Sequence, residues 1–146
     1  MAITRKTDSD YQFEVGIVVK DTDAALGFYR DTLGLEVTGT FAHPGLGVKA
    51  TAVQIGDTCL KLLEYADTPT ERNPKAGAIG LSYLTVPVDD VAAAVAACEA
   101  AGHEIDMAPL PVDEVPGEMA ACEFAFVLDP DGTRVELLRG SPWLAA

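Results

Sequence analysis

The sequence predicts an α+β fold made of two tandem βαβββ modules within a single domain of 146 residues. The order strand, helix, three strands runs through the chain twice, and the two runs share their internal spacing. Glu14 precedes Asp21 by seven residues, and Tyr83 precedes Asp90 by the same seven. Repetition at this scale predicts two copies of one supersecondary unit. One unit alone leaves its sheet uncovered, so we expect the two to pack together or across a dimer.

The first module, at about 11–65, begins with an alternating run. Its odd-numbered positions 13–19 are apolar and share one face of a predicted strand, while the even-numbered ones, including Glu14, fall on the other. A helix capped by Asp21 or Thr22 follows and ends at Gly34. Three further strands are expected at 36–41, 48–55 and 58–65, with a tight turn at 56–57.

The second module, at about 79–140, follows a polar linker at 66–78 and repeats this order. A strand at 81–88 leads into Asp89-Asp90 and a helix that turns Val91 and Cys98 inward and ends at Gly102. Strands are expected at 104–107, 121–128 and 133–139. The spacing of paired positions widens toward the module ends, which places an insertion in a loop at 109–118 that is rich in proline and acid.

The net charge of −13 argues against nucleic acid and anionic membranes as partners, because their phosphates repel such a surface. It suits a cationic ligand, or solubility alone. No apolar run approaches the roughly 18 residues that span a bilayer, and the polar start lacks a secretory signal. Three cysteines without CxxC spacing predict no disulfide framework. We therefore expect a soluble protein of the reducing cytoplasm.

Two segments carry a family resemblance. The run Lys20–Leu35, KDTDAALGFYRDTLGL, is similar to the first module of the vicinal oxygen chelate superfamily, and Asp129–Leu138, DPDGTRVELL, resembles its closing hairpin. That superfamily includes glyoxalase I, methylmalonyl-CoA epimerase, extradiol dioxygenases and bleomycin-resistance proteins. The resemblance covers about residues 11–139. It implies curved mixed sheets around a cleft for a small-molecule ligand, and a homodimer, but it does not specify the chemistry.

In this family the metal ligands lie on the first and last strand of each module. By registration those positions are Glu14, Lys61, Tyr83 and Glu136. The resemblance implies histidine or glutamine on first strands and glutamate on last strands, so only Glu136 matches. Lys61 is a poor ligand, because an ammonium has no lone pair and repels a dication. We therefore expect no cofactor. The less favoured alternative is a divalent metal held by Glu14, Glu136 and Tyr83.

Three functions follow from these four residues. In the first, an enzyme of isomerase, lyase or epimerase type uses Glu136 or Glu14 to move a proton, while Tyr83 and Lys61 stabilise negative charge on the substrate. In the second, a metal-free protein binds a small molecule or antibiotic without turnover. In the third, a metal-dependent enzyme resembles glyoxalase or dioxygenase.

Other residues are given structural roles. We expect His43 in a loop between strands and His103 on the surface after the second helix. Cys59 and Cys122 are expected to be inert thiols within strands. The acidic segment Asp113–Glu118 is either a lid over the cleft or a solvent-exposed loop.

Overall fold

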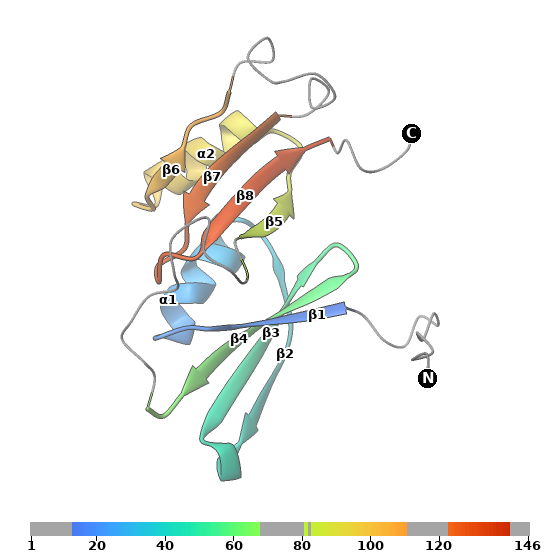
Figure 1. The fold of residues 1–146 in the computed structure, drawn as a ribbon, viewed down its shortest axis with the longest axis vertical. Coiled ribbons are helices and arrows are strands. Elements are labelled where there is room, and N and C mark those ends of the chain that lie inside the picture. Colours follow the sequence, from blue (N-terminus) through green and yellow to red (C-terminus); the bar gives the residue numbers. More distant parts are fainter. Residues whose placement is uncertain (1–12, 68–80, 82, 111–122, 141–146) are drawn as a thin grey trace.

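The computed structural model describes residues 13–67, 81, 83–110 and 123–140, except the side chains of Phe13, His43 and Leu46. Within these residues the predicted order, strand, helix, three strands, occurs twice (Figure 1). Each half forms a four-stranded mixed sheet, with strand orders β1-β4-β3-β2 and β5-β8-β7-β6. The predicted fold class is therefore confirmed. No helix of the described residues is long and apolar enough to span a membrane.

The first sheet consists of β1 (Phe13–Val18), β2 (Glu36–His43), β3 (Val48–Ile55) and β4 (Thr58–Tyr65). β1 runs parallel to β4, while the other neighbours are antiparallel. The strand β2 continues two residues beyond the predicted 41, because 41–43 pair with 48–50 of β3. His43 therefore ends β2, and its expected place in a loop is wrong.

The second sheet repeats this plan with shorter strands. It consists of β5 (Leu84–Pro87), β6 (Ile105–Met107), β7 (Glu123–Leu128) and β8 (Arg134–Arg139). β5 runs parallel to β8, and the remaining pairs are antiparallel. The expected linker at 66–78 lies largely outside the described residues, as do the lid segment Asp113–Glu118 and Cys122.

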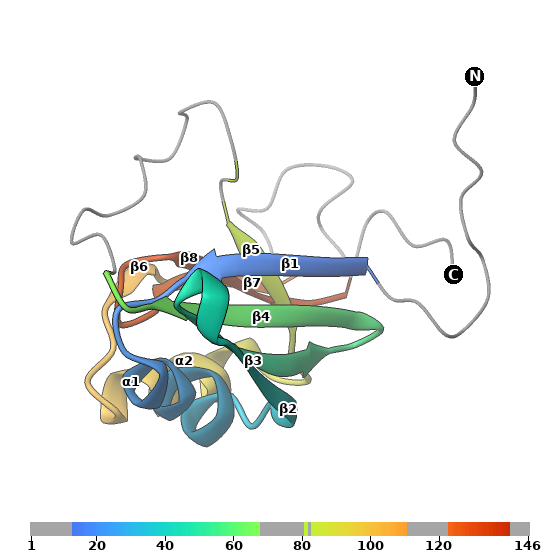
Figure 2. The ribbon, with the colours of Figure 1, turned by 90° about the horizontal axis from the view of Figure 1, so that it is seen from below.

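Both helices lie on the same side of the two sheets (Figure 2). Helix α1 (Thr22–Leu26) is capped by Asp21, and α2 (Val91–Ala100) by Asp90, as each carboxylate accepts from a backbone N–H of the first turn. Buried residues from both halves form one core, which includes Ile17 and Leu137. Among the described residues no helix covers the opposite face of either sheet.

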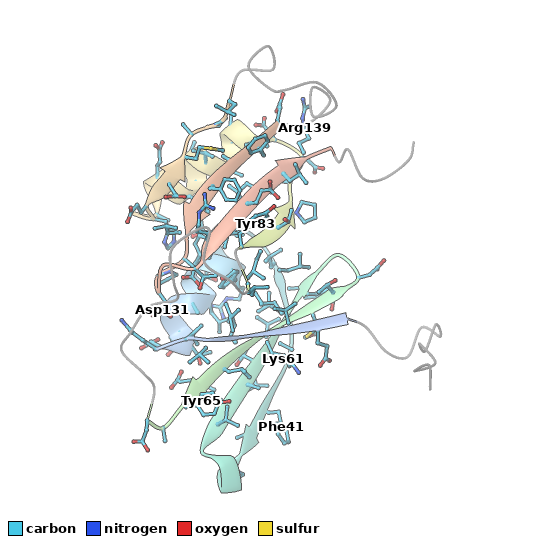
Figure 3. The ribbon with its side chains drawn as sticks, in the orientation of Figure 1. Phe41, Lys61, Tyr65, Tyr83, Asp131 and Arg139 are labelled. Carbon is cyan, nitrogen blue, oxygen red and sulfur yellow. The ribbon has the colours of Figure 1, made fainter. Side chains whose placement is uncertain are left out.

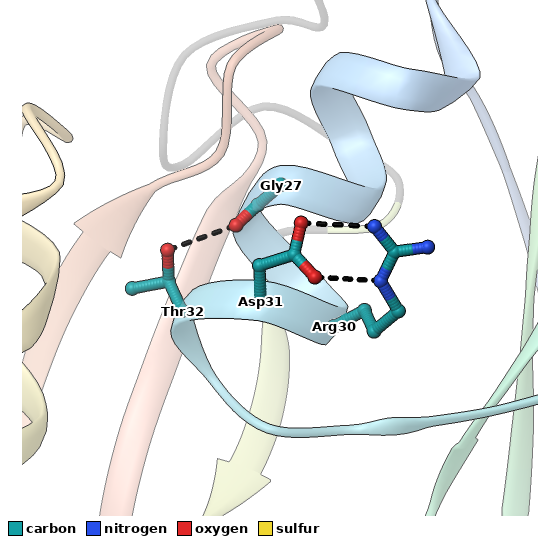
Figure 4. Close-up of polar contacts among 4 residues, drawn as sticks. All are labelled: Gly27, Arg30, Asp31 and Thr32. Atoms are coloured by element: carbon teal, nitrogen blue, oxygen red, sulfur yellow. Dashed lines mark hydrogen bonds and ion pairs between the residues drawn. The ribbon is translucent and has the colours of Figure 1, made fainter.

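The first helix widens after one turn into a π-helix, η1 (Gly27–Thr32) (Figure 4). The Thr32 hydroxyl donates to the Gly27 carbonyl at 2.9 Å, and Arg30 forms a surface ion pair with Asp31. The helical spacing of the apolar residues in this segment predicted one continuous α-helix. The wider turn places the adjacent residues Phe28 and Tyr29 together in the core, where both are fully buried.

Tyr29 also joins the two modules. Its hydroxyl donates a hydrogen bond of 2.9 Å to Oδ2 of Asp129, at the turn between β7 and β8. The other carboxylate oxygen accepts the backbone N–H groups of Asp131 and Thr133. Burial raises the pKa of the Tyr29 phenol, and the nearby Asp129 charge adds to this increase. One buried carboxylate therefore holds both the turn and the contact between modules.

We expect the pH dependence of stability to reveal this buried carboxyl. Burial raises the pKa of Asp129 above its ordinary value, despite the hydrogen bonds that lower it. A carboxyl with a higher pKa in the folded chain contributes stability at low pH, and that contribution is lost as the pH rises through the folded-state pKa. The variant Asp129→Asn lacks this loss. Its free energy of unfolding relative to that of the native protein should therefore increase as the pH rises above the ordinary Asp pKa of about 3.9, measured by urea unfolding. A constant difference above this pH would contradict the assignment.

Candidate functional site

The helix-free face of the second sheet carries Glu136. On β8 the neighbours Val135 and Leu137 are fully buried in the core, so Arg134, Glu136 and Leu138 point to the other face. On β5, Leu84 and Val86 lie in the core, which turns Thr85 to the face of Glu136. The alternation predicted from the sequence thus places Glu136 on the helix-free face.

Glu136 is buried on this face, with 8% of its surface exposed. Thr85 and Glu136 are direct partners in the parallel pairing of β5 with β8. The Thr85 hydroxyl donates a hydrogen bond of 2.7 Å to Oε2 of Glu136. No ion pair involves Glu136 among the described residues. Its carboxylate is therefore oriented by a neutral donor, the Thr85 hydroxyl.

Aromatic residues lie next to Glu136 on this sheet. Phe126 of β7 is the pairing partner of Glu136, and its ring contacts Tyr83 edge to face at a centroid distance of 5.1 Å. Phe124 meets Phe126 in the same manner at 6.3 Å. The Arg134 guanidinium lies over the Phe126 ring, 4.1 Å from its centroid, and binds Asp106 of β6. Tyr83 remains 42% exposed, so part of this aromatic surface is open to a ligand.

Glu14 and Lys61 form a separate pair on the first sheet. Lys61 Nζ lies 2.8 Å from Oε2 of Glu14, and both side chains are partly exposed. The hydrogen bond to Glu14 raises the pKa of the Lys61 ammonium. Between Glu14 and Val18 the strand carries Gly16, where an added Cβ would lie 3.0 Å from Cδ1 of Leu63. The glycine thus leaves room for Leu63 to cover the strand beside the pair.

The structure therefore divides the four predicted residues into two pairs. Glu14 contacts Lys61 on the first sheet, while Tyr83 and Glu136 share the Phe126 ring on the second. Figure 3 shows Lys61 beside β1 and β4, and Tyr83 beside β5 and β8. Among the described residues no hydrogen bond or ion pair connects the two pairs. The sequence placed the carboxylates on the correct strands, but their different partners became visible only in the structure.

The comparisons with known proteins establish the family. Residues 12–137 match the family described as the Glyoxalase/Bleomycin resistance protein/Dioxygenase superfamily. The chain belongs to this superfamily. The resemblance inferred from the two sequence segments is thereby confirmed.

Relatives within the superfamily differ in activity. The mitochondrial methylmalonyl-CoA epimerase of Mus musculus is 35% identical over 86 residues, which is 56% of this chain and 47% of that protein. The chain thus spans about half the length of the curated relatives it matches. The trypanothione-dependent glyoxalase I of Leishmania major has a TM-score of 0.66 and 26% identity, covering 88% of this chain and 86% of that one. TnmS3, an antibiotic-binding protein from Streptomyces sp. CB03234, has a TM-score of 0.64 and 23% identity, with coverages of 97% and 99%, and shows the fold alone.

The metal site that the superfamily resemblance implies does not fit the residues present. The Lys61 ammonium contacts the Glu14 carboxylate directly, at a position where a ligand would need a lone pair. No cluster of three or more His, Cys, Asp or Glu side chains suited to a metal occurs in the described part of the chain. At this position the chain therefore has the positively charged Lys61 beside Glu14, where a metal site would need a ligand.

Two further residues of this site were missed by the sequence prediction. Thr85 lies two residues after Tyr83 and Arg134 two before Glu136, so period-two alternation places each on the same face as its neighbour. The alternation of side chains could therefore have identified both residues from the sequence. The contacts of Arg134 with Asp106 and Phe126 could not be predicted in this way, because they depend on the pairing of β6, β7 and β8.

The structure also shows where His103 and two of the three cysteines lie. His103 is partly buried, and its ring lies edge to face against Phe28 at 4.8 Å, a contact that the sequence did not predict. Burial lowers the pKa of His103. Cys59 and Cys98 are buried, and burial raises the pKa of both thiols, in keeping with inert cysteines.

A cavity of about 400 Å³ lies away from Glu136, at the turn between β7 and β8. Lys20, His103, Glu104 and Asp131 are among its lining residues. Its most buried acid, Asp129, already has both carboxylate oxygens bonded within the chain. We therefore assign the functional site to the face around Glu136.

The variant Lys61→Glu tests whether Lys61 prevents a metal ion from binding beside Glu14. We expect millimolar Mn²⁺ or Ni²⁺ to leave the thermal midpoint of the native protein unchanged, because Lys61 repels a dication. Lys61→Glu supplies a carboxylate next to Glu14, and metal at roughly ten times its Kd should then add about 1.4 kcal/mol, or roughly 3 °C. Lys61→Met removes the ammonium without supplying a ligand and should show no metal effect. A metal-dependent rise in the native protein would contradict this interpretation.

Proposed function

We propose that the protein is a proton-transfer enzyme of epimerase or isomerase type, with Glu136 as the general base. The substrate is a small carbon acid with a C–H bond next to a carbonyl group. The observation that carries this proposal is the setting of Glu136, a buried carboxylate held by the neutral hydroxyl of Thr85. A fixed carboxylate at a partly apolar site is the usual equipment of a general base.

The two carboxylates are not equivalent as bases. The Lys61 ammonium lies 2.8 Å from Oε2 of Glu14, so this carboxylate oxygen is already bonded within the chain. Glu136 has no such partner among the described residues. Glu136 is therefore the stronger candidate, and Tyr83, which lies on the same sheet, is assigned to stabilising negative charge on the substrate oxygen.

The proposed step conserves atoms and charge. A Glu136 oxygen takes the proton from the carbon, and the C–H electron pair forms a C=C bond as the carbonyl π electrons move to oxygen. The result is an enolate and a neutral Glu136. Protonation of the opposite face of the same carbon by a water molecule, with Glu136 passing its proton to the solvent, gives the epimer, and return of the Glu136 proton to a neighbouring position gives an isomer.

The epimerase relatives support this chemistry, and their 56% coverage of this chain keeps the substrate a proposal. The same proposal includes no metal requirement. It also includes a cytoplasmic homodimer, as expected from the sequence. Size-exclusion chromatography with light scattering tests the dimer.

Replacement of Glu136 tests the base. With methylmalonyl-CoA as the first substrate, C2 deuterium incorporation in D₂O is followed by ¹H NMR, and a panel of 2-oxo and 3-oxo acids follows. Glu136→Gln keeps the shape of the side chain and removes its basicity, so the exchange rate should fall by about 10²- to 10⁴-fold. Glu123→Gln changes a carboxylate of β7 that pairs with Arg139, and should retain the native rate.

Equal exchange by native protein and Glu136→Gln would overturn the assignment of the base. Exchange that disappears on dialysis against a chelator, and returns with a divalent metal, would favour the metal-dependent alternative. Exchange lost equally in Glu123→Gln would show that any charge change on this sheet disturbs the protein.

Thr85 is proposed as the positioning residue for Glu136. Thr85→Val removes the hydroxyl at nearly constant volume, and we expect the exchange rate to fall about tenfold, the effect of one neutral hydrogen bond. Thr85→Ser restores the donor and should recover most of the rate. Failure of serine to restore the rate would indicate that the threonine methyl group, and not its hydroxyl, supports the site.

A binding protein without turnover is the second candidate. The exposed Tyr83 ring beside Phe126 offers an apolar surface for a flat ligand, and the net charge of −13 attracts a cation. Saturable binding of a cationic aromatic compound that is recovered unchanged, together with no proton exchange in any substrate of the panel, would favour this function.

A further inference from the structure

We propose that Arg134 is the substrate-binding residue of this site, and that the site takes small monoanionic carboxylates with a flat apolar group. This inference rests on the proposed function for the role of Glu136, and it adds the class of substrate. It follows from how Arg134 is held, which of its donors are used, and how far it lies from the base.

Arg134 is fixed from two directions. Its Nε donates a hydrogen bond of 2.8 Å to Oδ2 of Asp106 on β6, and its guanidinium lies 4.1 Å from the centroid of Phe126 on β7. Contacts with both an acid and an aromatic ring orient the planar group before any ligand arrives. A guanidinium oriented in this way loses less conformational entropy on binding than a free surface arginine.

The two terminal nitrogens of Arg134 are available to a ligand. Its contact with Asp106 uses Nε, and the described residues form no further ion pair with this guanidinium. No buried side-chain nitrogen or oxygen of the described residues lacks a hydrogen-bond partner, so an unbonded terminal nitrogen must reach solvent. The side chain is 23% exposed. Paired N–H donors in a plane match the two oxygens of a carboxylate.

The spacing from Arg134 to Glu136 suits a carbon acid. The two residues lie two positions apart on β8 and share its helix-free face, which separates their Cα atoms by about 6.6 Å. The guanidinium binds Asp106, whereas the Glu136 carboxylate binds Thr85, so the cation does not neutralise the base. A carboxylate held by Arg134 therefore directs the next carbons of the substrate toward Glu136.

Charge and shape narrow the ligand further. The net charge of −13 disfavours anions at long range, but salt screens that repulsion beyond about 8–10 Å, and contact with a guanidinium acts at shorter range. Asp106 already balances part of the Arg134 charge, so one negative charge is better tolerated than two. The adjoining rings of Tyr83, Phe126 and Phe124 favour a flat apolar group.

Three probes of one shape test the inference: phenylacetate, the neutral phenylacetamide and the cationic phenethylamine. Their affinities for the native protein are measured by ¹H–¹⁵N chemical-shift titration. We expect phenylacetate to bind at least tenfold more tightly than either other probe. Arg134→Gln should lose about tenfold or more in phenylacetate affinity, equivalent to about 1.4 kcal/mol. Inorganic phosphate is included to separate carboxylate recognition from recognition of any anion.

Arg139→Gln is the matched control, because Arg139 lies on the same strand and pairs with Glu123 at 2.7 Å. It should bind phenylacetate as the native protein does. Arg134→Lys keeps the charge without the paired planar donors and should also lose affinity, which guards against a folding defect in Arg134→Gln. Preference for phenethylamine, tighter binding of phosphate, or equal losses in Arg134→Gln and Arg139→Gln would each overturn the proposal.

These measurements need no turnover, so they separate the two proposals. Glu136→Gln should still bind phenylacetate with an unchanged dependence on Arg134. If that dependence holds while the native protein exchanges no protons, the proposed catalysis fails and the carboxylate site stands. If proton exchange depends on Glu136 but phenylacetate binding does not depend on Arg134, the proposed substrate class is rejected and the proposed catalysis is retained.

Discussion

The hydrogen bond between Tyr29 and Asp129 joins two halves of the chain that are 100 residues apart, and the geometry of the site depends on it. The same carboxylate accepts two backbone N–H groups of the turn that leads into β8. Asp131 in that turn also accepts the backbone N–H of Lys20, at the end of β1. The start of β8 is thus fixed against the first module. Because Arg134 and Glu136 follow within this strand, their positions are set by a contact that has no role in chemistry.

The two helix-free faces use acidic side chains in opposite ways. On the first sheet Glu14 is balanced by Lys61, which yields a neutral pair with little energetic consequence at the surface. On the second sheet Glu136 is buried beside aromatic rings and bonded only to a hydroxyl. The two carboxylates, one on the first strand of its module and the other on the last strand of its module, therefore have different electrostatic environments. This difference is what allows one carboxylate to be assigned as a base and the other as part of a charge pair.

Much of this arrangement could be predicted from alternation and repetition. The period of two placed Glu14 and Glu136 away from the core, and the repeat matched each with its counterpart. Three features required coordinates. The 3.6-residue pattern gave no sign that the first helix widens at Gly27–Thr32. His103 follows a helix-ending glycine, as surface residues often do, yet it packs against Phe28 from the other module. The partners of Arg134 lie on β6 and β7, and no local spacing reveals a contact between separate strands.

The parallel pairing of β1 with β4, and of β5 with β8, has a consequence for how the chain folds. Val15 pairs with Leu60, and Leu84 pairs with Val135, so each of these pairings joins strands that are far apart in the sequence. Bringing such distant strands together reduces the conformational entropy of the chain before favourable contacts form, and this slows folding. The antiparallel hairpins β3–β4 and β7–β8 have much shorter connections and can form early. Glu136 therefore joins its hairpin partner Phe126 before it meets Thr85, and the site is assembled in the last stage of folding.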